Sequence, residues 1–276
     1  MANIFNCKIS NIEILADAVY SITIDSSELA VQSMPGQFLH IKCGHSRILR
    51  RPISICDVQG DEINIVFEAK GAGTQWLAKR IAGQELDILA PLGNGYKIPD
   101  GKLIVVGGGV GTPPLLFTAR TAAQKFGIDT NTAKEKSVTA ILGFRSADRV
   151  ILEEDFKKHC AKVIVTTDDG SYGIHGAVTK PLEELLKTGE YTAVMSCGQL
   201  LMQKAVAEMC KKYNVLCQVS LEERMGCGIG ACLVCACETY IVNEQGSNNG
   251  ETQMSRACID GPVFIADEVV WQGEMK

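Results

Sequence analysis

Three kinds of hydrophobic pattern follow one another along the 276-residue chain. Up to about residue 100, short runs alternate apolar and polar positions, namely YSITI (20–24), FLHIKC (38–43) and EINIVF (62–67). In the last run Ile63, Ile65 and Phe67 fall on one face, which is the pattern of a half-buried strand. Because glycine- and proline-bearing turns separate the runs, we predict an antiparallel β-barrel domain over residues 1–100.

The pattern changes at Lys102, where the continuous apolar strand LIVVGGG leads into a helical run over 113–126. Further apolar strands at 138–142, 163–167 and 193–196 alternate with helical stretches at 153–159, 180–187 and 200–213. Alternation of buried strands with helices is typical of a parallel sheet covered on both faces. We therefore predict an α/β nucleotide-binding domain over residues 101–218.

The third part, residues 219–276, is short and rich in cysteine and glycine. A unit of this size builds only a small apolar core, so we predict that bound metal contributes to its folding. The polar stretch NEQGSNNGET at 243–252 is expected to be a turn or the tip of a hairpin.

Composition and charge narrow the class of protein. The chain is 46% hydrophobic and 21% charged, with 27 basic against 32 acidic residues and a net charge of -5, which is ordinary globular composition. No basic run is present, so neither nucleic acid nor a membrane surface is an expected partner. The N-terminal stretch resembles neither a secretory signal nor a membrane span, and we expect a cytoplasmic protein with reduced cysteines.

Cysteine spacing near the C-terminus carries the most specific chemistry. Four of the twelve cysteines form the pattern CxxxxCxxC followed by one distant cysteine, and they are Cys227, Cys232, Cys235 and Cys258. This is the plant-type ligand spacing of a [2Fe-2S] cluster. Gly226, Gly228 and Gly230 allow the loop to wrap closely around such a cluster. A structural zinc site is the alternative, although zinc modules usually pair two short CxxC knuckles. Cys237 does not fit the spacing and is expected to be a small core residue, like the remaining cysteines.

Two segments of the predicted barrel are suited to a diphosphate. The sequence RRPIS places Arg51, Pro52, Ile53 and Ser54 at one strand, where a guanidinium and a hydroxyl can bind phosphate oxygens. Downstream, KGAGT at 70–74 precedes the helical run QWLAKRI, and helix N-termini favour anions. Taken alone, an arginine at a strand end is often only solvated.

Glycines end the first strand of the predicted α/β domain. GGGVGTPPLL places Gly107, Gly108, Gly109 and Gly111 ahead of a helix that begins with prolines, which permits close approach of a nucleotide diphosphate. A tight strand-to-helix turn also needs glycines without any ligand.

Other polar groups are expected at the same edge of the sheet. Arg145 and Arg149 follow the second strand and are available to an adenosine ribose or phosphate, and Asp168 and Cys197 follow later strands. Ligands bind at the carboxyl edge of such sheets, although Cys197 is equally compatible with simple packing.

The order PGQF, RRPIS, KGAGT, PLGNG, GGGVGTPPLL, TDDGS, CG, the cysteine cluster and CIDGPVF resembles the ferredoxin-reductase family. Within it, the chain is most similar to electron-transfer subunits of class 1B dihydroorotate dehydrogenases. The resemblance implies an FAD site formed by Arg51, Pro52, Ile53, Ser54, Val66, Phe67, Glu68, Gly73 and Thr74. It also implies an NAD site formed by Gly107, Gly108, Gly109, Gly111, Thr112, Asp168 and Cys197. The chain departs from the family pattern in CGQLL, at Gln199 and Leu200.

The resemblance further implies an electron route in de novo pyrimidine synthesis. A separate FMN-containing catalytic subunit would oxidise dihydroorotate, the [2Fe-2S] cluster would carry electrons across the interface, and FAD would reduce NAD+. Two copies of each subunit are expected in a heterotetramer. No residue of this chain is expected to act on the pyrimidine, and the histidines at 40, 45, 159 and 175 are expected to be structural or on the surface.

Three alternatives share parts of this pattern. A small subunit of a ferredoxin-NADP+ reductase or sulfide dehydrogenase complex would carry the same flavin, nucleotide and cluster parts. An oxygenase reductase would also use them, but with a longer separate ferredoxin domain. A zinc-stapled nucleotide-binding module would have no redox role, and an absorption spectrum of protein purified without oxygen separates it from the others.

Overall fold

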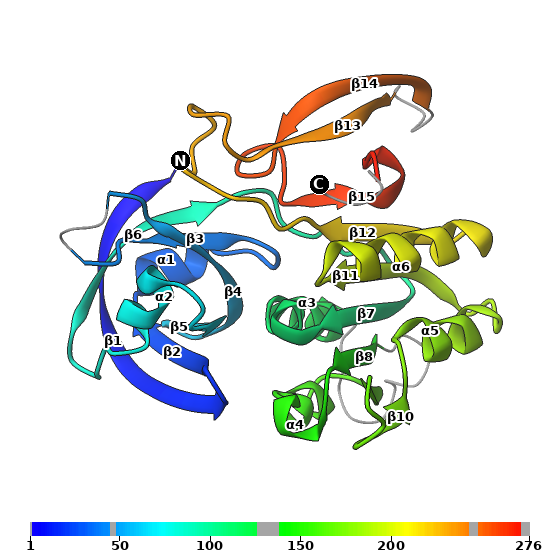
Figure 1. Ribbon diagram of the computed structural model, residues 1–276, viewed down its shortest axis with the longest axis horizontal. Helices are drawn as coiled ribbons and strands as arrows, with labels where there is room; N and C mark the ends of the chain where they lie inside the picture. Colours follow the sequence, from blue (N-terminus) through cyan, green and yellow to red (C-terminus); the bar gives the residue numbers. More distant parts are fainter. Residues whose placement is uncertain (1, 45–47, 126–137, 243–247, 272–276) are drawn as a thin grey trace.

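The computed structural model describes residues 2–44, 48–125, 138–242 and 248–271. It places the barrel beside the α/β sheet, with the cysteine-bearing loop and a hairpin above the junction (Figure 1). The expected architecture of barrel, parallel-sheet domain and small C-terminal unit is confirmed. The division of the chain at residues 100 and 218 stays a prediction.

Six antiparallel strands close the barrel in the order β1-β2-β5-β4-β3-β6. Their bounds are β1 Asn3–Ala16, β2 Val19–Asp25, β3 Phe38–Ile41, β4 Arg51–Gln59, β5 Glu62–Glu68 and β6 Glu85–Leu92. As predicted, Ile63, Ile65 and Phe67 of β5 all point into the barrel core. Helix α1 (Ser27–Gln32) contributes Leu29 to the same core, and α2 (Ala72–Leu77) contributes Leu77.

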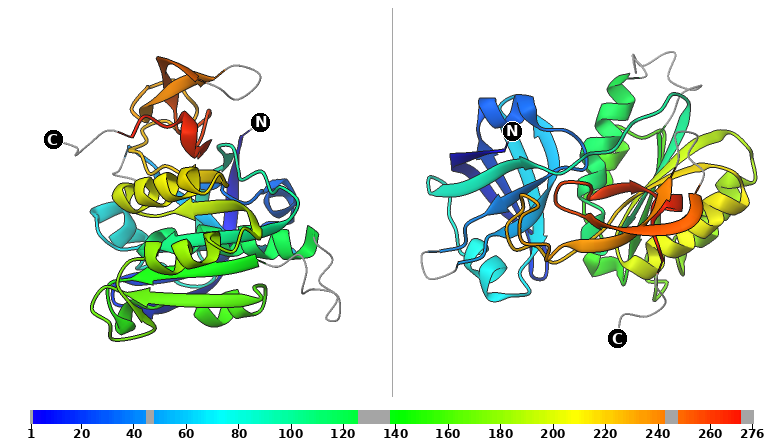
Figure 2. Two further views of the ribbon diagram at one scale, coloured as in Figure 1. Left: turned by 90° about the vertical axis from the view of Figure 1, so that its right-hand side faces the viewer. Right: turned by 90° about the horizontal axis from the view of Figure 1, so that it is seen from above.

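The second sheet has the order β10-β9-β8-β7-β11-β12-β15. Its parallel strands are β7 Lys102–Gly108, β8 Val138–Phe144, β9 Lys162–Thr167, β10 Ile174–His175, β11 Tyr191–Cys197 and β12 Leu216–Ser220. Its helices are α3 Pro114–Lys125, α4 Glu153–Lys157, α5 Thr179–Leu186 and α6 Leu200–Lys212. One apolar core lies under α3 and α4 and another under α5 and α6, so both faces are covered as expected (Figure 2).

The C-terminal segment is less separate than its composition indicates. Strands β13 (Ala236–Val242) and β14 (Asn248–Arg256) form their own hairpin, but β15 (Val263–Ile265) returns to pair antiparallel with β12. The stretch 243–252 was expected to be a turn or the tip of a hairpin, and it does connect the two strands of this hairpin, although β14 already begins at Asn248; positions 243–247 lie outside the described residues. The cysteine loop is therefore held between the edge of the α/β sheet and the barrel.

A buried ion pair joins the barrel to the α/β domain. Arg120 of α3 donates from Nε to Asp57 Oδ1 of β4 at 2.7 Å, and only 5% of the Asp57 side chain is exposed. Arg120 also donates to the backbone carbonyl of Val58. Since removing one partner leaves a charge buried, this contact ties the barrel firmly to the second domain. In the described part of the chain, no helix has the length and apolar character needed to cross a membrane.

Candidate functional site

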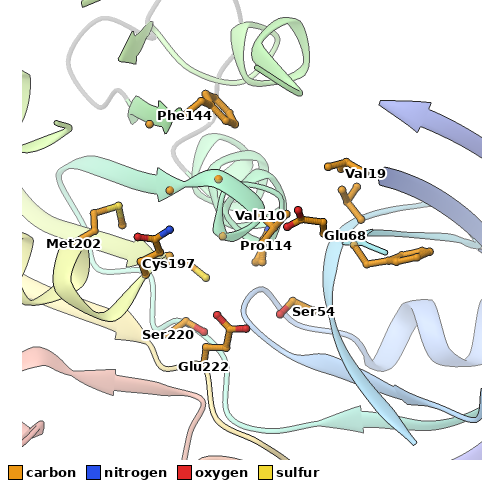
Figure 3. Close-up of a pocket in the computed structure, with 18 of the residues that line it drawn as sticks. Val19, Ser54, Glu68, Val110, Pro114, Phe144, Cys197, Met202, Ser220 and Glu222 are labelled. Atoms are coloured by element: carbon orange, nitrogen blue, oxygen red, sulfur yellow. The ribbon is translucent and has the colours of Figure 1, made fainter. Parts of the chain in front are cut away.

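A cavity of about 1420 Å³ lies between the barrel and the carboxyl edge of the α/β sheet (Figure 3). Its barrel wall comes from β4, β5 and the start of α2, and its other wall comes from the ends of β7, β8, β9 and β11. The segment 220–225, which leads from β12 to the cysteine loop, forms a third side. This size and position suit a large ligand between domains.

The barrel wall contains the expected diphosphate groups. Arg51 and Ser54 of β4 line the cavity, and Thr74 of α2 lies beside them on the same wall. Gly73 does not line the cavity, but a Cβ there would lie 2.4 Å from Arg51 Nε, so glycine at this position lets the arginine cross the helix. Helix α2 begins at Ala72, inside the KGAGT motif rather than after it. A half-buried guanidinium, two hydroxyls and backbone N–H groups at a turn fit a diphosphate chemically.

The Glu68 carboxylate lines the cavity, but two cationic side chains already contact it. Its Oε1 accepts from Arg149 at 3.2 Å and its Oε2 lies 2.9 Å from Lys70 Nζ. Arg149 also donates to the Asp17 carbonyl, so it joins the second domain to the barrel while still lining the cavity, and its contact with a nucleotide stays a prediction. Arg145 is exposed at the cavity wall and keeps the expected availability.

The glycine turn after β7 forms the opposite wall. Gly108, Gly109 and Gly111 line the cavity, and a Cβ at Gly111 would lie 2.6 Å from the Cys197 carbonyl oxygen, so only glycine fits there. Gly107 and Thr112 lie behind the wall, where a Cβ on Gly107 would meet Thr112 Oγ1 at 2.7 Å. These two residues shape the turn rather than face the cavity.

Cys197 and Asp168 reach the cavity from the ends of β11 and β9. Burial raises the pKa of the Cys197 thiol to about 12, despite a hydrogen bond with Ser220, so the thiol is protonated at neutral pH. Asp168 is exposed. Neither is arranged as a nucleophile with a base, which agrees with a binding rather than a covalent role.

Sequence reasoning missed the third side of the cavity. Ser220, Glu222 and Met225 line it, yet they were assigned to the cluster unit because the sequence style changes there. Burial and the neighbouring Glu222 raise the pKa of Glu223. The missed signal is that residue 220 ends a parallel strand, and such ends meet at the ligand edge.

The four cysteines expected to bind metal come together as two pairs. Cys227 contacts Cys232, and Cys235 contacts Cys258. Backbone N–H groups point at the sulfurs, from Ile229 to Cys227 Sγ at 3.4 Å and from Gly230 to Cys258 Sγ at 3.2 Å. No three metal-ligating side chains within the described ranges are close enough to hold one ion. Two thiol pairs fit a cluster with two irons better than a single zinc ion.

The surroundings of Cys227 favour the thiolate form of its side chain. Burial opposes ionisation of Cys227, but backbone N–H groups of Ile229 and Cys232 lower its pKa to about 7. Cys237 is set apart, because it packs against the α/β core and burial raises its pKa to about 11. Cys237 thus packs against the core, and its exclusion from the metal ligands stays a prediction.

Around the loop, several large apolar side chains face solvent. Cys232 is exposed, and Ile229, Leu233 and Val234 are 55%, 62% and 55% exposed. We call these three side chains the apolar loop patch, and they lie close to Cys232 in sequence. Exposed apolar groups that gather on one segment often mark interaction surfaces.

The histidines differ in their surroundings. His175 is exposed and His159 is half-buried, whereas His45 lies outside the described residues. His40 of β3 is fully buried beneath the cysteine loop. Burial and then the Arg50 cation lower the pKa of His40 to about 4, while the nearby backbone groups of Cys227 and Arg50 act in the opposite direction. Its imidazole is therefore neutral at physiological pH.

Comparison with known proteins gives consistent matches. Residues 222–270 match the family model described as the iron-sulfur cluster binding domain of dihydroorotate dehydrogenase B. The chain is 39% identical over 258 residues to the dihydroorotate dehydrogenase B (NAD(+)) electron transfer subunit of Caldanaerobacter subterraneus subsp. tengcongensis, covering 93% of this chain and 94% of that one.

Two solved structures extend the comparison. One, of an NADH-dependent reduced ferredoxin-NADP oxidoreductase, superposes with a TM-score of 0.81 and 28% identity, covering 96% of this chain and 90% of that chain. The other, a ferredoxin NADP+ reductase from Neisseria gonorrhoeae with bound FAD and NADP, superposes at 0.61 and 19% identity, covering 77% and 92%. The latter supports the fold alone.

Proposed function

The chain belongs to the dihydroorotate dehydrogenase B electron transfer subunits, and from that premise we propose how its two sites cooperate. It is an oxidoreductase subunit of NAD-dependent dihydroorotate oxidation in pyrimidine biosynthesis, with an iron–sulfur domain on a reductase fold. The finer proposal is an electron relay. Electrons enter from an FMN-containing catalytic subunit, pass through a [2Fe-2S] cluster and FAD in this chain, and leave on NAD+.

The cavity is proposed to bind FAD on its barrel wall. Arg51 and Ser54 would bind the diphosphate, assisted by Thr74, while Pro52, Ile53 and the segment 66–68 would support the flavin. Gly73 would act indirectly by making room for Arg51. When bound, FAD exchanges two electrons with a nicotinamide and single electrons with a cluster, which makes it the converter between the two.

The opposite wall is proposed to bind NAD. Backbone at Gly108, Gly109 and Gly111 leaves room for a dinucleotide, with Asp168 and Cys197 at its edges. Gly107 and Thr112 would maintain the turn behind these residues. The protonated Cys197 thiol offers a small neutral surface to a nicotinamide ring and no competing nucleophile.

The cluster is proposed to be held by Cys227, Cys232, Cys235 and Cys258, with backbone N–H groups of the loop bonded to its sulfurs. The observation that carries the proposal is the placement of these grouped thiols next to the third side of the cavity, through the segment 220–225. That placement would bring a one-electron carrier beside the proposed flavin site.

The apolar loop patch is proposed to contact the catalytic subunit, because a cluster that delivers electrons to another protein must lie close to its surface. The relatives are named as electron transfer subunits, which implies a catalytic partner. We further propose a heterotetramer with two copies of each subunit, located in the cytoplasm.

A second candidate is the small subunit of a ferredoxin-NADP+ reductase complex, which the likeness to the NADH-dependent ferredoxin-NADP oxidoreductase favours. The higher identity to dihydroorotate dehydrogenase B subunits over nearly the whole chain favours the first function. The test is copurification of the chain with a candidate FMN-containing catalytic subunit under anaerobic conditions, followed by an assay of dihydroorotate-dependent NAD+ reduction. Ferredoxin-dependent NADP+ reduction without the dihydroorotate reaction would support the second candidate instead.

A further inference from the structure

His40 stands out among the buried polar side chains. It is 0% exposed, and neither ring nitrogen makes a hydrogen bond to another described residue. A neutral imidazole carries one N–H donor and one acceptor, and buried polar groups of this kind almost always find partners. The unsatisfied ring therefore points to a contact that forms in the working protein.

The cysteine loop lies directly on this ring. A Cβ at Gly228 would lie 2.7 Å from His40 Nδ1, so only glycine, at a φ of +74°, allows the backbone after Cys227 to approach. The backbone groups of Cys227 and Arg50 near the ring both favour the protonated imidazole, as carbonyl acceptors do, and of these two Cys227 is the one on the loop that Gly228 brings against the ring.

Strand β3 also connects His40 to the proposed flavin cavity. On β3, His40 and Phe38 share the face opposite to Leu39 and Ile41, which point into the barrel core. His40 pairs across the ladder with Pro52 of the proposed FAD wall. Phe38 lines the cavity and also packs beside Cys235 and Cys258. This face of β3 is thus a thin partition between the flavin cavity and the cysteine loop.

We propose that His40 is a positioning residue for the cluster, whose ring N–H donates to the backbone carbonyl of Cys227 and holds the first ligand against the strand that lines the flavin cavity. This inference rests on the proposed function. The bond fixes the loop and places a donor dipole near the cluster. Because donors near a cluster stabilise its more negative reduced form, they raise its reduction potential.

The rival explanation is that His40 only fills space. Two variants separate the explanations, because His40→Met keeps a similar volume without an N–H donor, and His40→Gln keeps an N–H donor. The measurement is the cluster reduction potential, followed by electron paramagnetic resonance during an anaerobic redox titration of the complex with its catalytic subunit. We expect His40→Met to disfavour cluster reduction about tenfold, equal to ~59 mV for one electron, and His40→Gln to return most of that shift.

Equal potentials in the wild type and His40→Met, or equal shifts in both variants, would overturn the inference while leaving the proposed function intact. Wild-type protein that lacks both flavin and cluster would overturn both. If neither variant folds, wild-type protein labelled with [15N]histidine provides the test. Pulsed electron paramagnetic resonance is then expected to show one 15N coupled to the reduced cluster, and the absence of any coupling would refute the positioning role.

Discussion

The flavin cavity and the cysteine loop are built in opposite ways. The cavity lies between a closed barrel and a seven-stranded sheet, and apolar cores support each of its main walls. Of the grouped thiols, Cys227, Cys232 and Cys235 lie on a loop of turns and bends between β12 and β13 that also carries exposed apolar residues, and Cys258 lies in the turn after β14. The first site is shaped by packing before any ligand binds, whereas the second depends on its ligand for stability.

The largest expected effect comes from removing one cluster ligand. Cys232→Ser is expected to abolish the cluster and reduce dihydroorotate-dependent NAD+ reduction to background, because a hydroxyl is a poor substitute for a thiolate ligand. NADH-dependent dye reduction through FAD is expected to remain, since the barrel and the α/β domain form the two main walls of the cavity. Iron content and both activities are measured on one preparation.

Cys237→Ser is the matched control, because Cys237 lies near the ligands in sequence but packs against the α/β core. It is expected to retain iron and both activities. Equal loss of dye reduction in Cys232→Ser would show that the two regions are not independent.

The next largest effect is expected on the stability of the contact between the barrel and the α/β domain. Arg120→Ala removes the partner of buried Asp57 and is expected to destabilise the protein by about 3–5 kcal/mol. Chemical denaturation monitored by circular dichroism measures this loss. Lys125→Ala on the same helix is the control, because its pair with the exposed Asp100 contributes little. A stability loss no larger than that of the control would contradict the role of the buried pair.

Arg51→Ala tests the barrel wall of the cavity. Loss of one charge-assisted hydrogen bond, worth about 1.5–3 kcal/mol, is expected to weaken FAD binding roughly 10- to 150-fold. Flavin fluorescence during titration of the flavin-free protein measures the dissociation constant. Lys79→Ala removes an exposed cation outside the cavity and is expected to leave FAD affinity unchanged. Undiminished affinity in Arg51→Ala would place the diphosphate elsewhere.

The smallest effect is expected on the outer surface of the α/β domain. Glu183 accepts from Lys212 at 2.8 Å and from Tyr213 at 3.0 Å, and these contacts lower its pKa. Its contribution to stability is therefore present above the unfolded-state pKa and is lost as pH falls through the lower folded-state pKa. Glu183→Gln should flatten this part of the acid unfolding curve slightly, with cofactor content unchanged. A large loss of stability at pH 7 in Glu183→Gln would contradict the expectation that this surface contact contributes little.

The sequence predicted those features of the molecule that depend on the spacing of residues close together in the chain. The first three cysteines of the pattern, the RRPIS strand and the glycine turn after β7 were each visible because neighbouring residues create the feature. The alternation of Ile63 and Ile65 likewise indicated which face of β5 is buried. These features need no knowledge of distant contacts.

Features that depend on distant segments were not visible. Arg149 was expected to be available to a nucleotide, but its contacts with Glu68 and Asp17, far away in sequence, could not be predicted from local spacing. The three-residue strand β15 is too short to show a period, so its return to the sheet could not be read from the pattern. The contact between His40 and the cysteine loop joins positions almost two hundred residues apart, and spacing carries no signal of it.

The relay is tested most directly by the order of reduction in the complex with the catalytic subunit. Dihydroorotate is mixed anaerobically with the complex in a stopped-flow instrument, and absorbance reports the cluster and both flavins, so that reduction of FAD is the flavin bleaching beyond one equivalent of FMN. The account predicts that FAD in this chain is reduced rapidly in the wild type and at no more than background rate in Cys232→Ser. Equally fast flavin reduction without the cluster would contradict the central claim that electrons reach the cavity through the cysteine loop.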